Sequence, residues 1–272
     1  MDDPVFNIPD LTASGRIRQL FANANLDAAD LHHGALPADI RAAPNVVEDG
    51  TLIFKLIQQN KDLYNKFLNN RFCKGMAYGT LPSSTYDEFA KQDYLYLLDD
   101  VKFKALRFSK LNSRTSFSFL QVQADKIASA VKYAGEWKQT CIDDLGIPPA
   151  AMGDIEPSAA EIGYASFLRS ETALDDYLSL YIITIPCVYG WGQIAKMLDQ
   201  DPKTDKSSSF YKTWIQPNLD EQYGKQLSQF IEANRPLYAS TVNDVEWNDL
   251  FRTALKFEIG LFDSVLAQAP GS

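Results

Sequence analysis

The chain contains 272 residues, of which 46% are hydrophobic and 22% are charged, so it has enough apolar material for one large domain or two small ones. Its formal net charge of −9 repels phosphate backbones, which argues against a nucleic-acid partner. The three cysteines are widely spaced and odd in number, so they predict neither a disulfide framework nor a zinc site and are typical of a reducing cytosol. We therefore expect a cytoplasmic protein with no metal and no other cofactor, and the position of the only two histidines, His32 and His33, argues against a histidine-held haem.

Residues 1–48 are expected to form an N-terminal extension, followed by a helical domain over residues 49–272. The extension is rich in Pro, Ala and Asp, and it has room for one short helix at residues 11–24. A solvated extension is favoured here over a functional arm. The first ten residues, MDDPVFNIPD, are acidic and lack an apolar core, so they do not resemble a signal peptide.

From Thr51 onward, apolar residues recur with helical spacing, and glycine or proline punctuates the runs. A first helix is expected to begin at Thr51 and to stop at GTLP, residues 79–82. The stripe that it would bury consists of Leu52, Leu56, Gln59, Leu63 and Phe67.

The remaining helices follow in quick succession. Ser83, Ser84 and Thr85 are candidate N-caps for the next one. Helices are then expected over residues 86–110, 124–145, 159–170, 177–198, from about 210, over 222–234 and over 244–267. Gly146 suits the position just beyond the helix expected over residues 124–145. No stretch alternates long enough to predict a strand, so the fold class is all-α, a single bundle of about eight helices.

Residues 177–198 form the most apolar run, and they are apolar on nearly every helical face, which indicates burial. The length alone would suit a membrane span, but Pro186 and several Gly and polar residues interrupt the run, and no basic cluster flanks it. We expect the central helix of the bundle, kinked near Pro186, and no membrane partner. Cys187 lies beside the kink, and Trp191, four residues later, shares its face.

Three chemically distinctive residues lie on otherwise apolar helix faces: Asp93, Cys187 and Glu258. A carboxyl group that faces a core is costly to ionise, so its pKa rises, and a buried acid can then exchange a proton with a thiol. That combination suits nucleophilic cysteine chemistry without a histidine. The alternatives are an inert packing cysteine and carboxylates that turn to the rim of the bundle.

Four segments, in this order, resemble the TenA/thiaminase II family. They are FCKGMAYGTLPSSTYDEFAKQDYLYL (residues 72–97), IPCVYGW (185–191), FYKTWI (210–215) and FEIGLFD (257–263). The resemblance runs from about residue 51 to 268. It implies a haem-oxygenase-like helical fold without haem, assembled as a homo-oligomer, either a tetramer or a dimer.

The resemblance also implies an activity, namely hydrolytic C–N cleavage that releases 4-amino-5-hydroxymethyl-2-methylpyrimidine from thiamine or its degradation products in thiamine salvage. The partner would be a small aminopyrimidine or a related amine. Carried over by position, Cys187 would be the nucleophile, Asp93 would hold the aminopyrimidine and the thiol, and Glu258 would be the acid and base. The substrate pocket would be lined by Tyr96, Tyr164, Trp191 and Asn218.

This sequence departs from the family pattern at several positions. Asn218 stands where the family has a tyrosine, Asn70 and Arg71 stand where it has His-Pro, and Lys138 replaces a histidine. Because of Asn218, an alternative is an enzyme of a specialised-metabolite pathway that acts on a different amine or heterocycle. A non-catalytic ligand-binding or regulatory protein is a further alternative. A cofactorless oxidase of the PqqC type is the weakest, because its histidine-rich pocket is missing.

Overall fold

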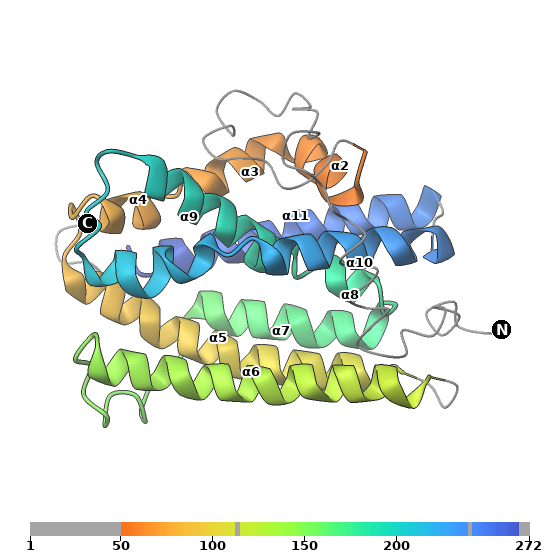
Figure 1. Cartoon of the computed structure of the whole chain (residues 1–272), viewed down its shortest axis with the longest axis horizontal. Helices are drawn as coiled ribbons and strands as arrows, with labels where there is room; N and C mark the ends of the chain where they lie inside the picture. Colours follow the sequence, from red (N-terminus) through yellow and green to blue (C-terminus); the bar gives the residue numbers. More distant parts are fainter. Residues whose placement is uncertain (1–49, 112–114, 239–240, 267–272) are drawn as a thin grey trace.

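The computed structural model describes residues 50–111, 115–238 and 241–266, and over these residues the chain is helical and contains no strand (Figure 1). The predicted all-α class is therefore confirmed. The predicted extension at residues 1–48, its short helix and the two histidines lie outside the described residues. The α-helices are α2 (Leu52–Gln59), α3 (Lys61–Leu68), α4 (Arg71–Ala77), α5 (Ser83–Ser109), α6 (Phe117–Asp143), α7 (Ala159–Leu174), α8 (Ser179–Ile182), α9 (Trp191–Gln200), α10 (Gln222–Tyr238) and α11 (Thr241–Ser264).

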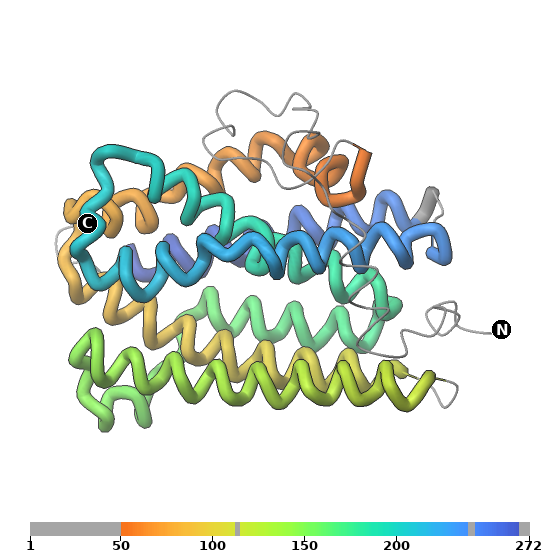
Figure 2. The backbone as a smooth tube through the Cα atoms, in the orientation of Figure 1, coloured from red at the N-terminus to blue at the C-terminus, as the bar shows by residue number. Residues whose placement is uncertain are grey.

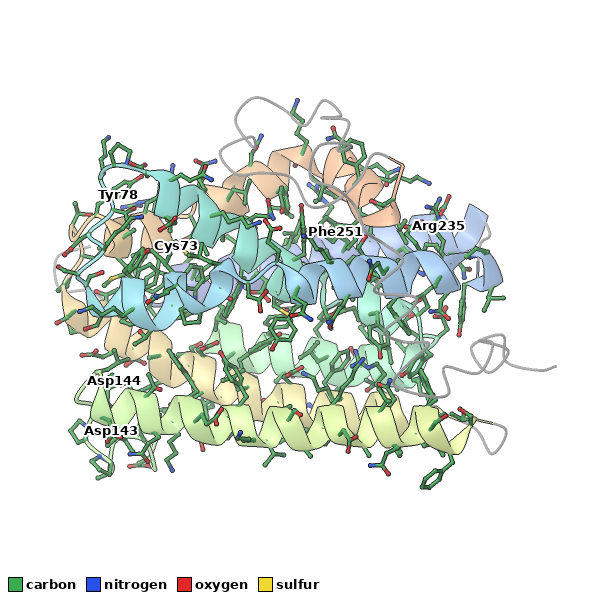
Figure 3. The ribbon with its side chains drawn as sticks, viewed as in Figure 1. Cys73, Tyr78, Asp143, Asp144, Arg235 and Phe251 are labelled. Atoms are coloured by element: carbon green, nitrogen blue, oxygen red, sulfur yellow. The ribbon has the colours of Figure 1, made fainter. Side chains whose placement is uncertain are left out.

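The long helices α5, α6, α7, α10 and α11 run along the longest dimension of the molecule, and the short helices α2, α3 and α4 cover α11 on one side (Figures 1 and 2). The termini of several helices lie at the two ends of this bundle. Tyr78, which follows α4, and Asp143, which ends α6, lie at one end, while Arg235 of α10 lies near the other (Figure 3). Within the described residues, no helix has the length and apolarity needed to cross a membrane.

Local sequence explains most helix ends. The side chains of Thr51, Ser116 and Ser158 accept hydrogen bonds from backbone N–H groups at the starts of α2, α6 and α7. Gly79 and Gly146 follow α4 and α6 with φ of 64° and 72°, where a side chain would be strained. Ser83, Ser84 and Thr85 are not caps, because α5 already begins at Ser83 and Pro82 occupies the position before it.

The single helix predicted from Thr51 to GTLP is wrong, since α2, α3 and α4 divide it at Asn60 and Asn70. Asn60 donates to the Leu56 carbonyl at 2.9 Å and to Asn248 Oδ1 at 2.7 Å. Asn70 Oδ1 accepts from the Phe72 amide at 2.8 Å, and its Nδ2 donates to Asp263 Oδ1 at 3.0 Å. Both breaks are thus bonded to α11. Gln59 is exposed rather than part of the buried stripe.

The central stretch is buried as predicted but is not one regular helix. It comprises α8, a turn, the π-helical segment Pro186–Gly190 and then α9. The predicted kink near Pro186 corresponds to this irregular part, where a wider helical turn accommodates the missing proline N–H. The helix predicted from about residue 210 is likewise a π-helical segment, Tyr211–Ile215, followed by a short 3₁₀ turn.

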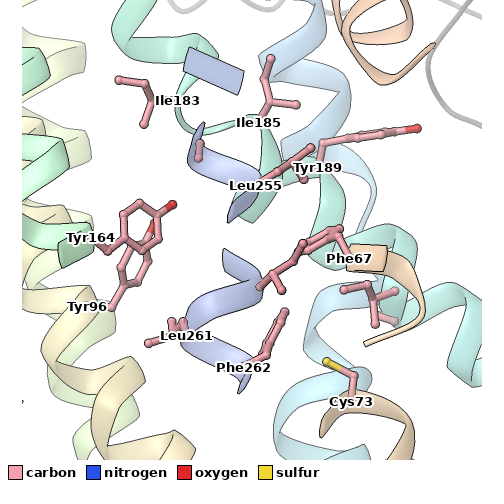
Figure 4. Packing of buried hydrophobic residues seen from close by; sticks show 14 of the residues in the cluster. Phe67, Cys73, Tyr96, Tyr164, Ile183, Ile185, Tyr189, Leu255, Leu261 and Phe262 are labelled. Atoms are coloured by element: carbon pink, nitrogen blue, oxygen red, sulfur yellow. The ribbon is translucent and has the colours of Figure 1, made fainter. Parts of the chain in front are cut away.

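Aromatic rings form the core around α11. Phe262 stacks on Phe72 and Phe89, with ring centroids 5.8 and 5.5 Å apart, and Phe72 and Phe89 are 4.7 Å apart. Figure 4 shows Phe262 and Cys73 on one side of the α11 ribbon and Tyr96 with Tyr164 on the other. The core therefore divides around α11 into an aromatic side and a side that carries polar groups.

Candidate functional site

Glu258 lies in the last third of α11 and is fully buried, with 0% of its surface exposed. Tyr164 Oη donates to its Oε1 at 2.7 Å, and Trp191 Nε1 donates to its Oε2 at 2.8 Å. Burial raises the pKa of Glu258 to about 7, and the two hydrogen bonds act in the opposite direction because they favour the ionised form. The side chain is thus held rigidly by both oxygens and titrates near neutrality.

Asp93 lies on α5, is 4% exposed, and faces the interior as predicted. Its Oδ1 is buried and accepts no hydrogen bond from the described residues. Burial raises the pKa of Asp93 to about 8, and the charge of Glu258 adds to the rise. A buried carboxyl oxygen that accepts no hydrogen bond is uncommon in proteins. It indicates either that the group is protonated or that a bound ligand donates to it.

Cys187 lies in the π-helical segment Pro186–Gly190, and its residue is partly exposed. Its thiol donates to the Thr184 carbonyl at 3.3 Å. Burial of the sulfur raises the pKa of Cys187 above its usual range, and the charge of Glu258 adds to this, while Tyr96 lowers it. The thiol is therefore protonated at neutral pH and needs a base before it can attack.

Tyr96 and Tyr164 bridge these groups. Tyr96 follows Asp93 by one turn of α5, Tyr164 projects from α7, and their ring centroids are 5.0 Å apart (Figure 4). Tyr164 also stacks on Phe257 at 5.3 Å with nearly parallel rings. Because Tyr96 interacts with Cys187 and Tyr164 bonds Glu258, hydroxyl groups line the space between the thiol and the acid.

Trp191 and Asn218 differ in how they relate to this cluster. Trp191 was predicted to contact a substrate, and in the structure its indole N–H is bonded to Glu258. Asn218 Nδ2 donates to the Trp214 carbonyl at 2.8 Å, which caps the segment Tyr211–Ile215. The backbone carbonyl of Asn218 lies against Gly192, so the residue adjoins α9 next to Trp191.

Sequence reasoning missed two charges near the thiol, Asp100 and Lys104. They are ion-paired, and they influence the pKa of Cys187 in opposite directions. The signal was present, since residues 93, 96, 100 and 104 share one face of a helix at spacings of three and four. Within the described residues, no group of three or more His, Cys, Asp or Glu side chains is placed to hold a metal ion.

Known proteins similar to this chain include two aminopyrimidine aminohydrolases. The one from Halalkalibacterium halodurans is 25% identical over 179 residues, which are 65% of this chain and 76% of that protein. The one from Helicobacter pylori is 22% identical over 76% of this chain and 95% of that protein. A Haemophilus influenzae protein described as uncharacterized is 26% identical over 78% of this chain and 97% of its own length.

Solved structures agree on the fold. A TenA homologue from Pyrococcus furiosus has a TM-score of 0.67 at 18% identity and covers 79% of this chain and 99% of its own. A Shewanella denitrificans domain of unknown function with a heme oxygenase-like fold has a TM-score of 0.61 at 15% identity, covering 82% of this chain and 94% of its own. The model of the TENA/THI-4/PQQC family matches residues 57–268. With that match over most of its length, the chain belongs to the TENA/THI-4/PQQC family and has the heme oxygenase-like helical fold.

Proposed function

We propose that the protein is an aminopyrimidine hydrolase of the thiaminase II type. It would cleave the C–N bond that joins an aminopyrimidine to its leaving amine and release the hydroxymethyl-pyrimidine. The observation that carries the proposal is the buried, donor-free Oδ1 of Asp93, which lies within the electrostatic reach of the buried Glu258, the same acid that acts on the Cys187 thiol. An aminopyrimidine offers an amino donor at the edge of a flat ring, which suits such an oxygen and the neighbouring tyrosine rings.

The proton chemistry follows from the acidities of the three groups. Because the Cys187 thiol is protonated at neutral pH, a base must remove its proton as the sulfur adds to the pyrimidine ring. Asp93 and Glu258 have pKa values of about 8 and 7, so each exchanges protons readily at neutral pH. In this scheme the Glu258 carboxylate takes the thiol proton as sulfur adds to the ring and delivers it to the departing amine as the C–N bond breaks. The carboxylate then takes a proton from the water that bonds to the freed carbon and returns it to sulfur as the C–S bond breaks and the ring is restored.

The test is direct. Purified protein is incubated separately with thiamine and with the aminomethyl-pyrimidine breakdown product, and release of the hydroxymethyl-pyrimidine is followed by mass spectrometry. We expect release that disappears in Cys187→Ala and persists in Cys73→Ala, because Cys73 is fully buried and lies on the other side of α11 (Figure 4). Release that survives loss of Cys187 would refute cysteine catalysis, and no release from either compound would refute the substrate class.

A second prediction concerns Glu258. Glu258→Gln keeps one acceptor oxygen, which can take the Trp191 N–H, while its amide N–H can donate to the Tyr164 hydroxyl oxygen. The amide cannot exchange a proton, so we expect ligand binding to persist while turnover falls about 10²- to 10⁴-fold. Binding is measured by calorimetry with the product pyrimidine, and turnover is measured as above. If the variant fails to fold by circular dichroism, Glu258 is a structural residue and the proposed acid is wrong.

The alternative on the same scaffold is an enzyme that acts on another amine or heterocycle. The observation that favours it is Asn218, whose amide is committed to the Trp214 carbonyl where the family pattern has a tyrosine. Calorimetry with a panel of amines on Cys187→Ala would distinguish the two, because this alternative requires another compound to bind more tightly than the aminopyrimidine.

A further inference from the structure

A buried cation lies away from the carboxyl groups, near the end of α5. Arg107 is only 5% exposed, and its guanidinium carbon is 3.9 Å from the ring centroid of Tyr181 and 5.5 Å from that of Phe103. Among the described residues, no carboxylate pairs with this guanidinium. A buried guanidinium without a counter-charge is costly, and the contact with the Tyr181 ring offsets part of that cost.

The surroundings of Arg107 are polar and positively charged. Tyr181 Oη donates to Gln123 Oε1 at 3.2 Å, and it lies 3.2 Å from Tyr177 Oη. Lys104 on α5 and Lys126 on α6 both act electrostatically on Tyr181. Lys104 is paired with Asp100, whereas Lys126 is exposed and, like Arg107, has no carboxylate partner within the described residues. Arg107 and Lys126 are therefore the two cations near Tyr181 that have no carboxylate partner among the described residues.

Tyr181 reports the strength of this field. Burial opposes ionisation of its hydroxyl, yet Arg107, Lys126, Lys104 and the hydrogen bond with Tyr177 together hold the pKa of Tyr181 below its ordinary value, whereas burial keeps the pKa of Tyr177 raised. In a chain whose formal net charge is −9, a positive field around a buried tyrosine is a local exception. It indicates that this part of the bundle favours negative charge.

We propose that Arg107, with Lys126 at its outer edge and Lys104 beside it, forms an oxyanion-binding site for a phosphate or carboxylate group. The planar guanidinium can bond two oxygens of such a group while its face remains on Tyr181. The site is separate from the Asp93–Glu258 cluster, because Arg107 follows Asp93 by 14 residues, or about 21 Å of helix. It nevertheless lies on the same face of α5, in line with Asp93, Tyr96, Asp100 and Lys104.

The first test measures binding of inorganic phosphate and of pyrophosphate to the wild-type protein and its variants by calorimetry at low ionic strength, because neither anion contains a C–N bond that the proposed reaction could cleave. We expect Arg107→Gln to weaken binding at least tenfold and Lys126→Gln to weaken it about threefold, since the lost charges are buried and exposed respectively. Lys132→Gln is the matched control, because Lys132 is also exposed on α6 but pairs with Glu136. It should leave binding unchanged.

Arg107 is buried, so a folding failure of its variant would leave Lys126→Gln, at an exposed residue, to decide the test. Equal phosphate affinity in wild type, Lys126→Gln and Lys132→Gln would overturn the proposal, as would a wild-type protein that binds neither anion. These outcomes are independent of the proposed function, since they do not require any hydrolysis.

A second arm identifies the source of the anion. Thiamine and thiamine monophosphate differ by one phosphate, and their affinities for Cys187→Ala are compared with and without the Lys126→Gln change. If the phosphate ester binds more tightly and loses that advantage in the double variant, the oxyanion belongs to the ligand of the main site. If the two bind alike while free phosphate still depends on Lys126, the site takes a separate small anion.

Discussion

At the scale of single residues, the candidate site depends on two carboxyl groups that the fold keeps from ionising fully. Asp93 and Glu258 lie on different helices, and their pKa values are raised mainly by burial and, for Asp93, also by the charge of Glu258. Each pKa unit is worth about 1.4 kcal/mol. The folded protein should therefore become less stable as these carboxyl groups lose their protons.

The free energy of unfolding should fall as the pH rises from about 5 to 8. In that range the unfolded chain has released the protons of both carboxyl groups, whereas the folded chain still holds them, so folding takes up protons. Asp93→Asn removes one of these protons. Between pH 5.5 and 7.5 we expect its stability to fall less steeply than that of wild type, by up to about 2 kcal/mol in total.

Urea unfolding at a series of pH values checks this expectation. Glu136→Gln is the control, because Glu136 is an exposed carboxylate on α6 and should leave the slope unchanged. Identical slopes for wild type and Asp93→Asn would show that Asp93 is already ionised in the folded protein.

Tyr164 should set the acidity of Glu258. Its hydroxyl donates to Oε1 and favours the carboxylate, so Tyr164→Phe removes that support and should raise the pKa of Glu258 further. A hydrogen bond to a charged group is worth about 1.5–3 kcal/mol, so the limb of the pH–rate profile that reports Glu258 should move upward by about one to two pH units. Tyr223→Phe, at a tyrosine that is 66% exposed, should leave the profile in place. A lower rate with an unmoved profile would mean that Tyr164 only shapes the pocket.

At the scale of helices, the sequence predicts which segments are helical better than where they break. Periodicity was sufficient for α7, α10 and α11, and glycines with positive φ follow two of the predicted ends. The breaks at Asn60 and Asn70 depend on Asn248 and Asp263 of α11, which lie 188 and 193 residues away along the chain. Helical spacing within one segment carries no information about such partners. The same limit applies to Arg107 and Lys126. They lie on α5 and α6, and only the packing of these two helices shows that both act on one site.

The π-helical segment gives an element-scale prediction at Gly190. A Cβ there would lie 2.6 Å from Phe67 Cε1 and 3.1 Å from Phe67 Cζ, and the Phe67 ring is fully buried. Gly190→Ala should therefore lower the free energy of unfolding by about 1–3 kcal/mol through overpacking. Gly135→Ala on exposed α6, where nothing lies within 4 Å, should instead raise it by about 0.5–1 kcal/mol. Urea unfolding compares the two, and equal effects would show that Phe67 moves aside without cost.

At the scale of the whole molecule, α11 joins the two sides of the core. It supplies Phe262 to the aromatic side and Glu258 to the polar side, and its partners there come from α4, α5 and α7. The motif FEIGLFD thus encodes a packing surface and a reactive group in about two turns of helix. This explains why the candidate acid could be found from the sequence, whereas its two hydrogen-bond donors required the fold.

The last prediction concerns residues 1–48, which we propose to be an extension that the helical domain does not need. The buried core identified among the described residues runs from Leu52 to Val265, and the family match begins at residue 57. A chain that starts at residue 49 should then keep its helical circular dichroism and unfold within a few degrees of the full chain. Light scattering should give both chains the same assembly, a dimer or a tetramer. A loss of about 10 °C or more would mean that the first 48 residues stabilise the domain, and a change of assembly alone would place them at the contact between copies.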